Sequence, residues 1–290
     1  MIARPARVLS IAGSDSGGGA GIQADIKTAT ALGAYAMTAI TAVTAQNTLG
    51  VEAVFAVPPE IVRKQIIACL DDIGADAIKI GMLCSASVVE TVAEVLRARA
   101  GGIPIVLDPV ILSTSGTPLL DDDGVDVLRK KLIPLAAVVT PNIPEAALLT
   151  GFACNGDEAI LRSGKALLAM GAKAALIKGG HANAEFLSDV LVVPNAFGTF
   201  DHAKLDTPHT HGTGCTLAAA IAVGLAQGRD IRQSVGRAHA FVQHAITTAP
   251  AFGHGCGPLN HMWQLRNDRA DLDLWGSEMD HRSRCIAGLK

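Results

Sequence analysis

The sequence lacks several features that would assign it to a specialised class of protein. No apolar run comes near the roughly 20 residues that a membrane-spanning helix needs. Residues 1–7 run directly into an expected strand and show no signal-peptide pattern. The 24 Lys and Arg residues stand against 27 Asp and Glu, which gives a net charge of −3 without a basic stripe. We therefore expect neither a membrane partner nor a nucleic-acid partner.

The cysteines are few and scattered. They are Cys69, Cys84, Cys154, Cys215, Cys256 and Cys285, and no two of them form a Cys-x-x-Cys pair. This spacing is not typical of a metal cluster or of a disulfide framework, so the reducing cytoplasm is the simplest compartment for the chain.

What the sequence does contain is an alternation of strands and helices in a chain that is 49% hydrophobic. Apolar or β-prone runs predict strands at residues 7–12, 36–45, 51–57, 77–80, 103–107, 137–140, 174–177, 186–193 and 199–205. Helices are predicted near residues 22–32, 59–72, 87–100, 124–132, 158–170, 216–227 and 231–248. This alternation predicts an α/β fold with a mostly parallel sheet covered on both faces, in which the last two strands are antiparallel. We expect one domain over residues 1–264 and a charged, mobile tail over residues 265–290.

The stretch from His209 to Cys215 is the most distinctive part of the chain. It places Gly212 and Gly214 beside a thiol, and an apolar, alanine-rich run to Gln227 follows at once. We interpret it as a glycine loop that opens a helix, whose unpaired first amides attract an anion such as phosphate. A glycine turn before a core helix explains the loop alone equally well. Cys215 favours a functional role, because a thiol at a helix N-terminus is expected to have a lowered pKa.

Polar residues and glycines collect where the predicted strands end, which is where parallel sheets bind ligands. These positions are Gly13 to Gly21, Gln46, Gly81, Met82, Asp108, Asn142, Glu145 and Lys178 to His181. Asp108 and Glu145 are either Mg²⁺ ligands beside a nucleotide or, respectively, a turn residue and a helix-terminal acid. Lys178 is either a phosphate contact or a solvated lysine. Asp25 is either a charge complementing the helix dipole or a substrate contact.

Two common nucleotide-binding patterns are incomplete in this chain. Residues 19–24 place glycines as a dinucleotide-binding loop does, but the next β segment ends near Gln46 without the acid that holds a ribose. A P-loop would need Gly-Lys-Ser/Thr after the glycines, and that sequence is absent. His209, His211 and His254 lack metal-ligand spacing and are interpreted as loop histidines. A loop that approaches a small ligand closely remains as the interpretation of the N-terminal glycines.

Together, these motifs closely resemble the hydroxymethylpyrimidine/phosphomethylpyrimidine kinases of thiamine biosynthesis, within the ribokinase-like superfamily. The resemblance is carried by residues 11–25, 43–48, 79–83, 107–110, 140–145, 178–181, 210–215 and 253–258. It implies a ribokinase-like three-layer α/β/α fold and a kinase that depends on ATP and Mg²⁺. Such a kinase phosphorylates 4-amino-5-hydroxymethyl-2-methylpyrimidine and then phosphorylates the monophosphate to the diphosphate.

The resemblance also implies which residues bind the pyrimidine. Gln46 would hydrogen-bond the aminopyrimidine edge, and Gly13, Asp25 and Met82 would line the same pocket. By resemblance alone, the protein is also expected to be a homodimer.

Other residues are implied at the phosphate end of the site. Asp108 and Glu145 would lie near the metal, and Lys178 near the nucleotide phosphates. The anion hole would consist of Gly212, Thr213, Gly214 and Cys215. Phosphoryl transfer depends mainly on positioning and charge stabilisation, which helix-terminal amides provide. Cys215 is our candidate for the base that takes the carbinol proton.

One position departs from the family pattern, and three other functions remain as alternatives. Thr114 stands where many members carry a lysine before Ser-Gly, so no cationic role is inferred there. The nearest alternative is a pyridoxal or pyridoxine kinase of the same superfamily, whose substrate also bears a hydroxymethyl group. The others are a nucleotide dehydrogenase, weakened by the missing ribose acid, and a non-catalytic metabolite-binding protein.

Overall fold

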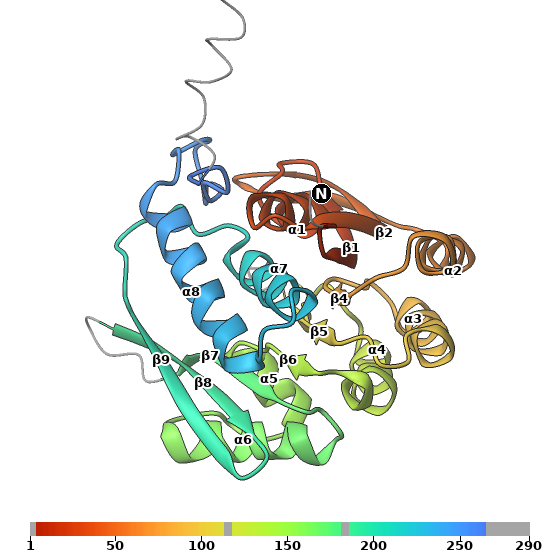
Figure 1. The fold of residues 1–290 in the computed structure, drawn as a ribbon. Helices are drawn as coiled ribbons and strands as arrows, with labels where there is room; N and C mark the ends of the chain where they lie inside the picture. Colours follow the sequence, from red (N-terminus) through yellow and green to blue (C-terminus); the bar gives the residue numbers. More distant parts are fainter. Residues whose placement is uncertain (1–3, 113–117, 181–185, 265–290) are drawn as a thin grey trace, which may run out of the picture.

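The computed structural model describes residues 4–112, 118–180 and 186–264, in which one sheet lies between two layers of helices (Figure 1). The strands are β1 (Arg7–Asp15), β2 (Tyr35–Asn47), β3 (Gly50–Ala56), β4 (Ala77–Ile80), β5 (Ile105–Leu107), β6 (Val138–Val139), β7 (Ala175–Gly180), β8 (Phe186–Val193) and β9 (Ala196–Ala203). The helices are α1 (Gly21–Ala31), α2 (Pro59–Ala68), α3 (Ala86–Arg99), α4 (Asp122–Val127), α5 (Ile143–Thr150), α6 (Asp157–Ala169), α7 (Thr213–Ala226) and α8 (Ile231–Thr247). The predicted three-layer α/β/α fold is confirmed.

The strands lie in the order β3-β2-β1-β4-β5-β6-β7-β8-β9. From β2 to β7 in this order, neighbouring strands pair in parallel, whereas β3, β8 and β9 pair antiparallel with their neighbours. The side chains of Leu9, Ile11, Ile78 and Ile80 are completely buried. Continuous apolar runs are expected of such central strands, because helices cover both of their faces.

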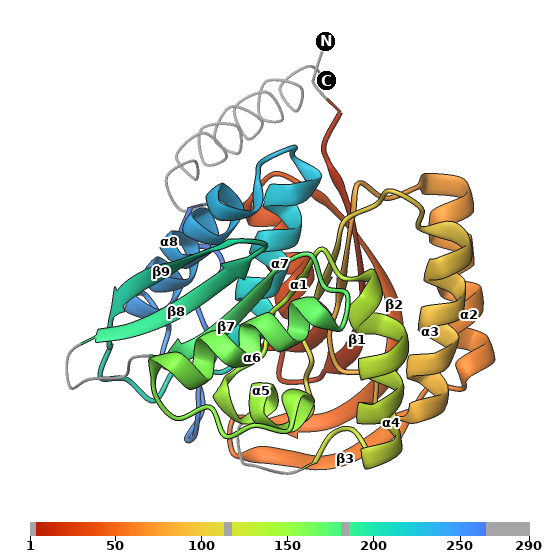
Figure 2. The same cartoon turned by 90° about the horizontal axis from the view of Figure 1, so that it is seen from below.

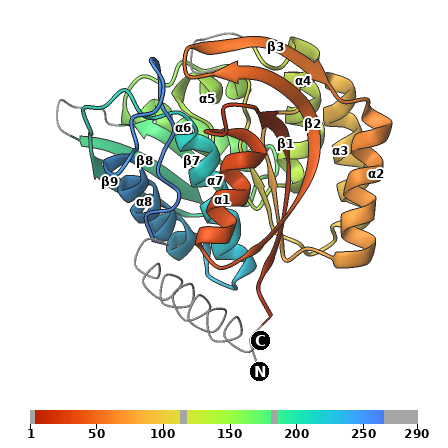
Figure 3. The ribbon, with the colours of Figure 1, turned by 90° about the horizontal axis from the view of Figure 1, so that it is seen from above.

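The two helical layers bury different parts of the chain. Helices α1, α7 and α8 cover one face of the sheet, and α2 to α6 cover the other (Figures 2 and 3). Helix α7 packs against α1, α8 and the central strands, so its residues from Thr216 to Gly224 are all buried. This central position explains why the alanine-rich run shows almost no polar face.

The position of β1 determines where a ligand can enter the fold. Because β1 lies between β2 and β4, the chain moves outward from β1 to β2 and then returns to the other side of β1. A crevice forms at the carboxyl ends of strands where the strand order reverses in this way. The register of β1 against β2 also shifts between Ala12 and Ser14, so Gly13 lies at an irregularity that opens onto this crevice.

Among the α-helices of the described residues, α5 matches none of the predicted helical ranges, although Glu145 was considered as a helix-terminal acid. Helix α5 begins directly after Asn142, although Pro141 and Pro144 on either side of this residue suggest a turn. Proline is tolerated in the first turn of a helix, where its missing N–H has no partner to lose. The predicted tail, residues 265–290, and Thr114 lie outside the described residues. Within the described part of the chain, no helix combines the length and apolarity required to cross a membrane.

Candidate active site

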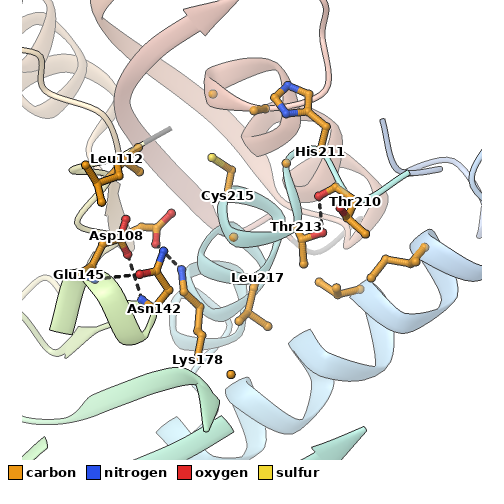
Figure 4. Close-up of a pocket in the computed structure, with 18 of the residues that line it drawn as sticks. Asp108, Leu112, Asn142, Glu145, Lys178, Thr210, His211, Thr213, Cys215 and Leu217 are labelled. Atoms are coloured by element: carbon orange, nitrogen blue, oxygen red, sulfur yellow. Dashed lines mark hydrogen bonds and ion pairs between the residues drawn. The ribbon is translucent and has the colours of Figure 1, made fainter. Parts of the chain in front are cut away.

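A cavity of about 890 Å³ opens at the carboxyl ends of the parallel strands (Figure 4). Its lining includes Gly13, Gln46, Met82, Asp108, Glu145, Lys178, Gly212, Thr213, Gly214 and Cys215. These predicted site residues come from both ends of the chain, and the fold brings them to one space.

Asp108 and Lys178 form an ion pair inside this cavity. Lys178 Nζ lies 2.9 Å from Asp108 Oδ1, and the Thr140 hydroxyl donates to the same oxygen at 3.1 Å. Burial alone would raise the pKa of Asp108, but the positive charges of Lys178 and Lys79 hold the pKa below its usual value. The cavity therefore contains a charged carboxylate beside a cation, and the interpretation of Lys178 as a solvated lysine is wrong.

Glu145 is a helix-terminal acid, one of the two roles considered for it, and it also lines the cavity. It forms a capping box at the start of α5: its amide donates to Asn142 Oδ1 at 2.8 Å, and its Oε2 accepts from the Asn142 amide at 2.9 Å. The same side chain lines the cavity near Asp108 and Lys178. Burial raises the pKa of Glu145 to about 7; the charge of Asp108 adds to this rise, and that of Lys178 opposes it.

The predicted anion hole lies against this charged cluster. Helix α7 begins at Thr213, and Gly212 at its N-cap has a left-handed φ of +87°. A Cβ atom on Gly212 would lie 1.8 Å from the carbonyl oxygen of Gly19, and one on Gly214 would lie 3.2 Å from Lys178 Nζ. Because neither glycine has a side chain, the start of the helix comes close to the cation, where its dipole also favours an anion.

Gln46 lines the same cavity, next to His211. Its Oε1 is 3.2 Å from the Thr44 hydroxyl, and its Nε2 is 3.3 Å from His211 Nε2. A Cβ atom on Gly13 would lie 2.7 Å from Met82 Cε, so the missing side chain makes room for the methionine. An apolar thioether and a carboxamide in one cavity suit a flat heteroaromatic ring with polar edges.

Asp108 and Glu145 also fit a magnesium ion. Mg²⁺ is commonly held by one or two carboxylates together with substrate phosphates and water. Within the described residues, no group of three or more His, Cys, Asp or Glu could hold a metal ion. Two carboxylates beside Lys178 in this cavity are the donor set expected of an ion that binds together with a nucleotide.

Comparison with known proteins agrees with this geometry. The family model for phosphomethylpyrimidine kinase matches residues 15–260. A hydroxymethylpyrimidine/phosphomethylpyrimidine kinase of Streptomyces coelicolor is 47% identical over 261 residues, which cover 90% of this chain and 96% of that protein. The chain belongs to the phosphomethylpyrimidine kinase family. The resemblance inferred from the sequence and the kinase activity are therefore confirmed.

Solved structures include relatives of two kinds. The phosphomethylpyrimidine kinase of Clostridium difficile 630 is 42% identical, with a TM-score of 0.74 and coverage of 83% of this chain and 99% of that one. The ADP complex of Bacillus subtilis pyridoxal kinase is 34% identical, with a TM-score of 0.83 and coverage of 90% and 99%. Both agree with the ribokinase-like architecture of this kinase.

Asp25 is the one predicted site residue of this kinase that is not in the cavity lining. It is buried, with its Oδ2 at 2.9 Å from Lys79 Nζ and at 2.5 Å from the Ser10 hydroxyl. Its Oδ1 has no hydrogen-bond partner among the described residues. Lys79 was not predicted to be a site residue, although a lysine inside the apolar strand β4 is a signal that could have identified it. Asp25 thus pairs with a buried cation, a role that the sequence did not suggest.

The expected lowering of the pKa of Cys215 is wrong. Burial raises the pKa of this thiol to about 11, and the negative charges of Asp25 and Asp108 act in the same direction. Lys79 and the amide of Gly21 act in the opposite direction but do not compensate. Desolvation therefore outweighs the positive charge of Lys79, and the thiol is protonated at neutral pH.

His211 is a second residue that the sequence did not reveal. It lines the cavity, and its Nε2 lies 2.9 Å from Asp15 Oδ2. Although it is in a loop as predicted, it also takes part in the site. The signal available was its position next to Gly212, but its partner is 196 residues away in the sequence and could not be identified from spacing.

Proposed function

We propose that this kinase phosphorylates the hydroxymethyl group of 4-amino-5-hydroxymethyl-2-methylpyrimidine and then phosphorylates the monophosphate to the diphosphate. The observation that supports this most is the single cavity that contains both Gln46 and the loop from Gly212 to Cys215. An aminopyrimidine edge both donates and accepts hydrogen bonds, and the carboxamide of Gln46 complements it. The name of the Streptomyces coelicolor relative includes both kinase activities.

The phosphate end of the cavity supports ATP as the phosphoryl donor. In this proposal, the terminal phosphate lies at the start of α7, where the amides of residues 213–215 and Lys178 stabilise its oxygens. Asp108 and Glu145 would hold Mg²⁺, which supplies neutralisation of the phosphate charge when it is bound.

The remaining part of the cavity supports a nucleotide base and ribose. Apolar side chains there are Leu187, Leu205, Leu217, Val242 and Ile246. Asp189, His202 and His239 lie among them and could hydrogen-bond polar groups of a nucleotide. A largely apolar pocket with a few polar groups is typical of nucleotide and cofactor sites.

The role proposed for Cys215 follows from its pKa. A thiol that is protonated at rest has to lose its own proton before it can take one from the carbinol. We therefore propose that Cys215 acts mainly through its backbone amide in the anion hole, and that the thiol is a weak base at most. In a loose phosphoryl-transfer transition state the attacking hydroxyl needs little help from a general base, which is consistent with this role.

We also propose that the kinase works as a cytoplasmic homodimer. Strand β3 lies at the edge of the sheet, and its Val51, Val54 and Phe55 side chains are exposed. An exposed apolar edge strand favours pairing with another chain. The cysteines of the described residues, from Cys69 to Cys256, are free thiols, which agrees with a reducing compartment.

Product analysis with the pyrimidine alcohol and Mg-ATP tests the proposed function. The expected products are the monophosphate first and the diphosphate later, and Gln46→Ala is expected to weaken pyrimidine binding while nucleotide binding is retained. ATP turnover that never depends on the pyrimidine alcohol would contradict the proposal. Glu158→Gln, on the exposed surface of α6, is a control that leaves both products unchanged.

A second activity can be measured in the same assay. The pyridoxal kinases of Bacillus subtilis and Staphylococcus aureus have TM-scores of 0.81 to 0.83 with this chain. Pyridoxal also carries a hydroxymethyl group on a flat ring. Comparing kcat/KM for pyridoxal and for the pyrimidine alcohol shows which of the two the cavity prefers.

A further inference from the structure

Asp15 and His211 join the two loops that close one end of the cavity. His211 Nε2 lies 2.9 Å from Asp15 Oδ2. The His211 side chain is 16% exposed and the Asp15 side chain 4%. The Asp15 carboxylate also accepts hydrogen bonds from the amides of Gly17, Gly19 and Ala20, at 2.8, 3.0 and 2.8 Å. A carboxylate with four donors around it holds the glycine loop after β1 and connects it to the loop before α7.

The position of the proton on His211 follows from its two neighbours. Gln46 Nε2, which can only donate, lies 3.3 Å from the same ring nitrogen that faces Asp15. One nitrogen cannot donate to a carboxylate and accept from an amide at the same time. The contact with Asp15 is shorter and involves a charged acceptor, so we assign the proton to Nε2 and its hydrogen bond to Asp15.

The charge of Asp15 supports this assignment. Burial alone would raise the pKa of Asp15, but the hydrogen bond from His211 and those from the amides of Ala20 and Gly17 hold the pKa below its usual value. An ionised carboxylate accepts and does not donate, so the proton between the two groups belongs to the imidazole.

We propose that His211 is a positioning residue for the substrate ring. Because it donates to Asp15, it offers Gln46 no acceptor, and the amide hydrogens of Gln46 remain available to the ligand. The Thr44 hydroxyl lies 3.2 Å from Gln46 Oε1 and 3.1 Å from the Ser14 carbonyl oxygen, and its single hydrogen serves one of these acceptors at a time. This inference rests on the proposed contact between Gln46 and the pyrimidine. With its amide hydrogens free, Gln46 favours aromatic rings that present an acceptor nitrogen to it.

The side chain of His211 can be changed while its backbone stays anchored. The His211 amide donates to the carbonyl of Gly257 at 3.1 Å, and His211 also forms a β-bridge with Pro258. Its ring lies against Gly19, where a Cβ would be 2.4 Å from His211 Cδ2. His211→Phe keeps the ring and removes the donor, whereas His211→Gln keeps an N–H donor that can reach Asp15.

A double-mutant cycle with Gln46 tests the proposal. We expect His211→Phe to raise KM for the pyrimidine alcohol about tenfold, as for the loss of one well-placed hydrogen bond, and to leave KM for ATP within about twofold. His211→Gln should recover most of the loss. In the Gln46→Ala background, His211→Phe should have no further effect, because residues that act through one contact are not additive. Additive effects, or equal rises in both KM values, would overturn the proposal.

A second measurement does not depend on turnover. In ¹⁵N-histidine NMR of the unliganded wild type, with His211→Gln identifying the signal, Nε2 of His211 should carry the proton. An unprotonated His211 Nε2, which would accept a hydrogen bond from Gln46 Nε2, would overturn the inference, whatever the substrate is. Absence of pyrimidine phosphorylation by the wild type would instead contradict the proposed function, and the NMR result would still decide the role of His211.

Discussion

Lys79 and Asp25 form an ion pair that is shielded from solvent: Nζ lies 2.9 Å from Oδ2, and the side chains are 0% and 3% exposed. Burial would lower the pKa of Lys79, but the negative charges of Asp25 and Asp108 raise it, so the lysine remains charged. This cation lies inside an apolar strand below the cavity and compensates much of the negative charge around it.

Removing this cation should destabilise the protein strongly. Lys79→Met leaves Asp25 as a buried carboxyl without its cation, and burial already raises the pKa of Asp25, so it has to stay charged without a partner or take up a proton. Breaking such a buried pair costs on the order of 3–5 kcal/mol in the free energy of unfolding. Adding Asp25→Asn should recover most of that loss, because the buried charge is gone. Urea denaturation measures both effects. The control is Lys64→Met on α2, whose side chain is 70% exposed, and a loss of stability there as large as for Lys79 would contradict the explanation.

The high pKa of Cys215 predicts that its thiol reacts slowly with alkylating reagents. At pH 8 we expect iodoacetamide to modify Cys215 at least about tenfold more slowly than a free cysteine, because the thiolate is the reactive form. The rate should rise steeply towards pH 10, and mass spectrometry of the labelled peptide measures it. Rapid labelling at pH 7 would contradict the raised pKa and support the lowered pKa that the sequence suggests.

The same pKa predicts how much activity depends on the thiol. Removal of a general base typically costs a factor of about 10² to 10⁴ in turnover. Because Cys215 is protonated at rest, we expect Cys215→Ala to lower kcat by less than about tenfold, within the effect of a lost contact. A loss above a hundredfold would show that the thiol takes the carbinol proton during the reaction.

The raised pKa of Glu145 predicts that the stability of the folded protein depends on pH. Its pKa rises from 4.5 to about 7 on folding, so the folded chain binds the proton more tightly than the unfolded chain. The corresponding stability is fully present below about pH 4.5 and is lost as the pH rises through about 7, with a total of about 3 kcal/mol. Glu145→Gln should remove this slope in urea denaturation between pH 5 and 8. The exposed Glu158→Gln is the control, and an unchanged slope in Glu145→Gln would contradict the assignment.

Gly212 should not tolerate any side chain. Alanine there would have a φ of +87° and a Cβ at 1.8 Å from the Gly19 carbonyl oxygen, so the loop would have to move. We expect Gly212→Ala to abolish most of the turnover and to lower the melting temperature. Gly101→Ala is the matched control, because a Cβ atom on Gly101 would have no neighbouring atom within 4 Å. Full activity in Gly212→Ala would show that the anion hole does not need this geometry.

The fold was largely predictable because each buried strand has a local sequence signal. Residues 77–80 and 186–193 were predicted as strands with the bounds that the structure gives to β4 and β8. The helix α5 was missed although its start has a sequence signal: Asn142 and Glu145, three residues apart, match the capping-box pattern, and proline is tolerated in the first turn.

The site was predictable only in part. The rule that ligands bind at the carboxyl ends of parallel strands is sufficient to group Gln46, Asp108 and Lys178. The partners of Lys79 and His211 could not be inferred, because they are 54 and 196 residues away along the chain. The pKa of Cys215 was predicted with the wrong sign, because the desolvation of the thiol and the charges of Asp25 and Asp108 that raise its pKa come from parts of the chain distant in sequence.

The contact between Asp15 and His211 has a consequence for synthesis on the ribosome. Domains fold from their N-terminal part as the chain emerges, but the glycine loop after β1 lacks its imidazole partner until residue 211 has been translated. Nascent chains that stop before that point can pair their first strands but have no complete catalytic chamber. Prematurely terminated translation products of this kinase should therefore be inert towards its substrates, however well their strands are ordered.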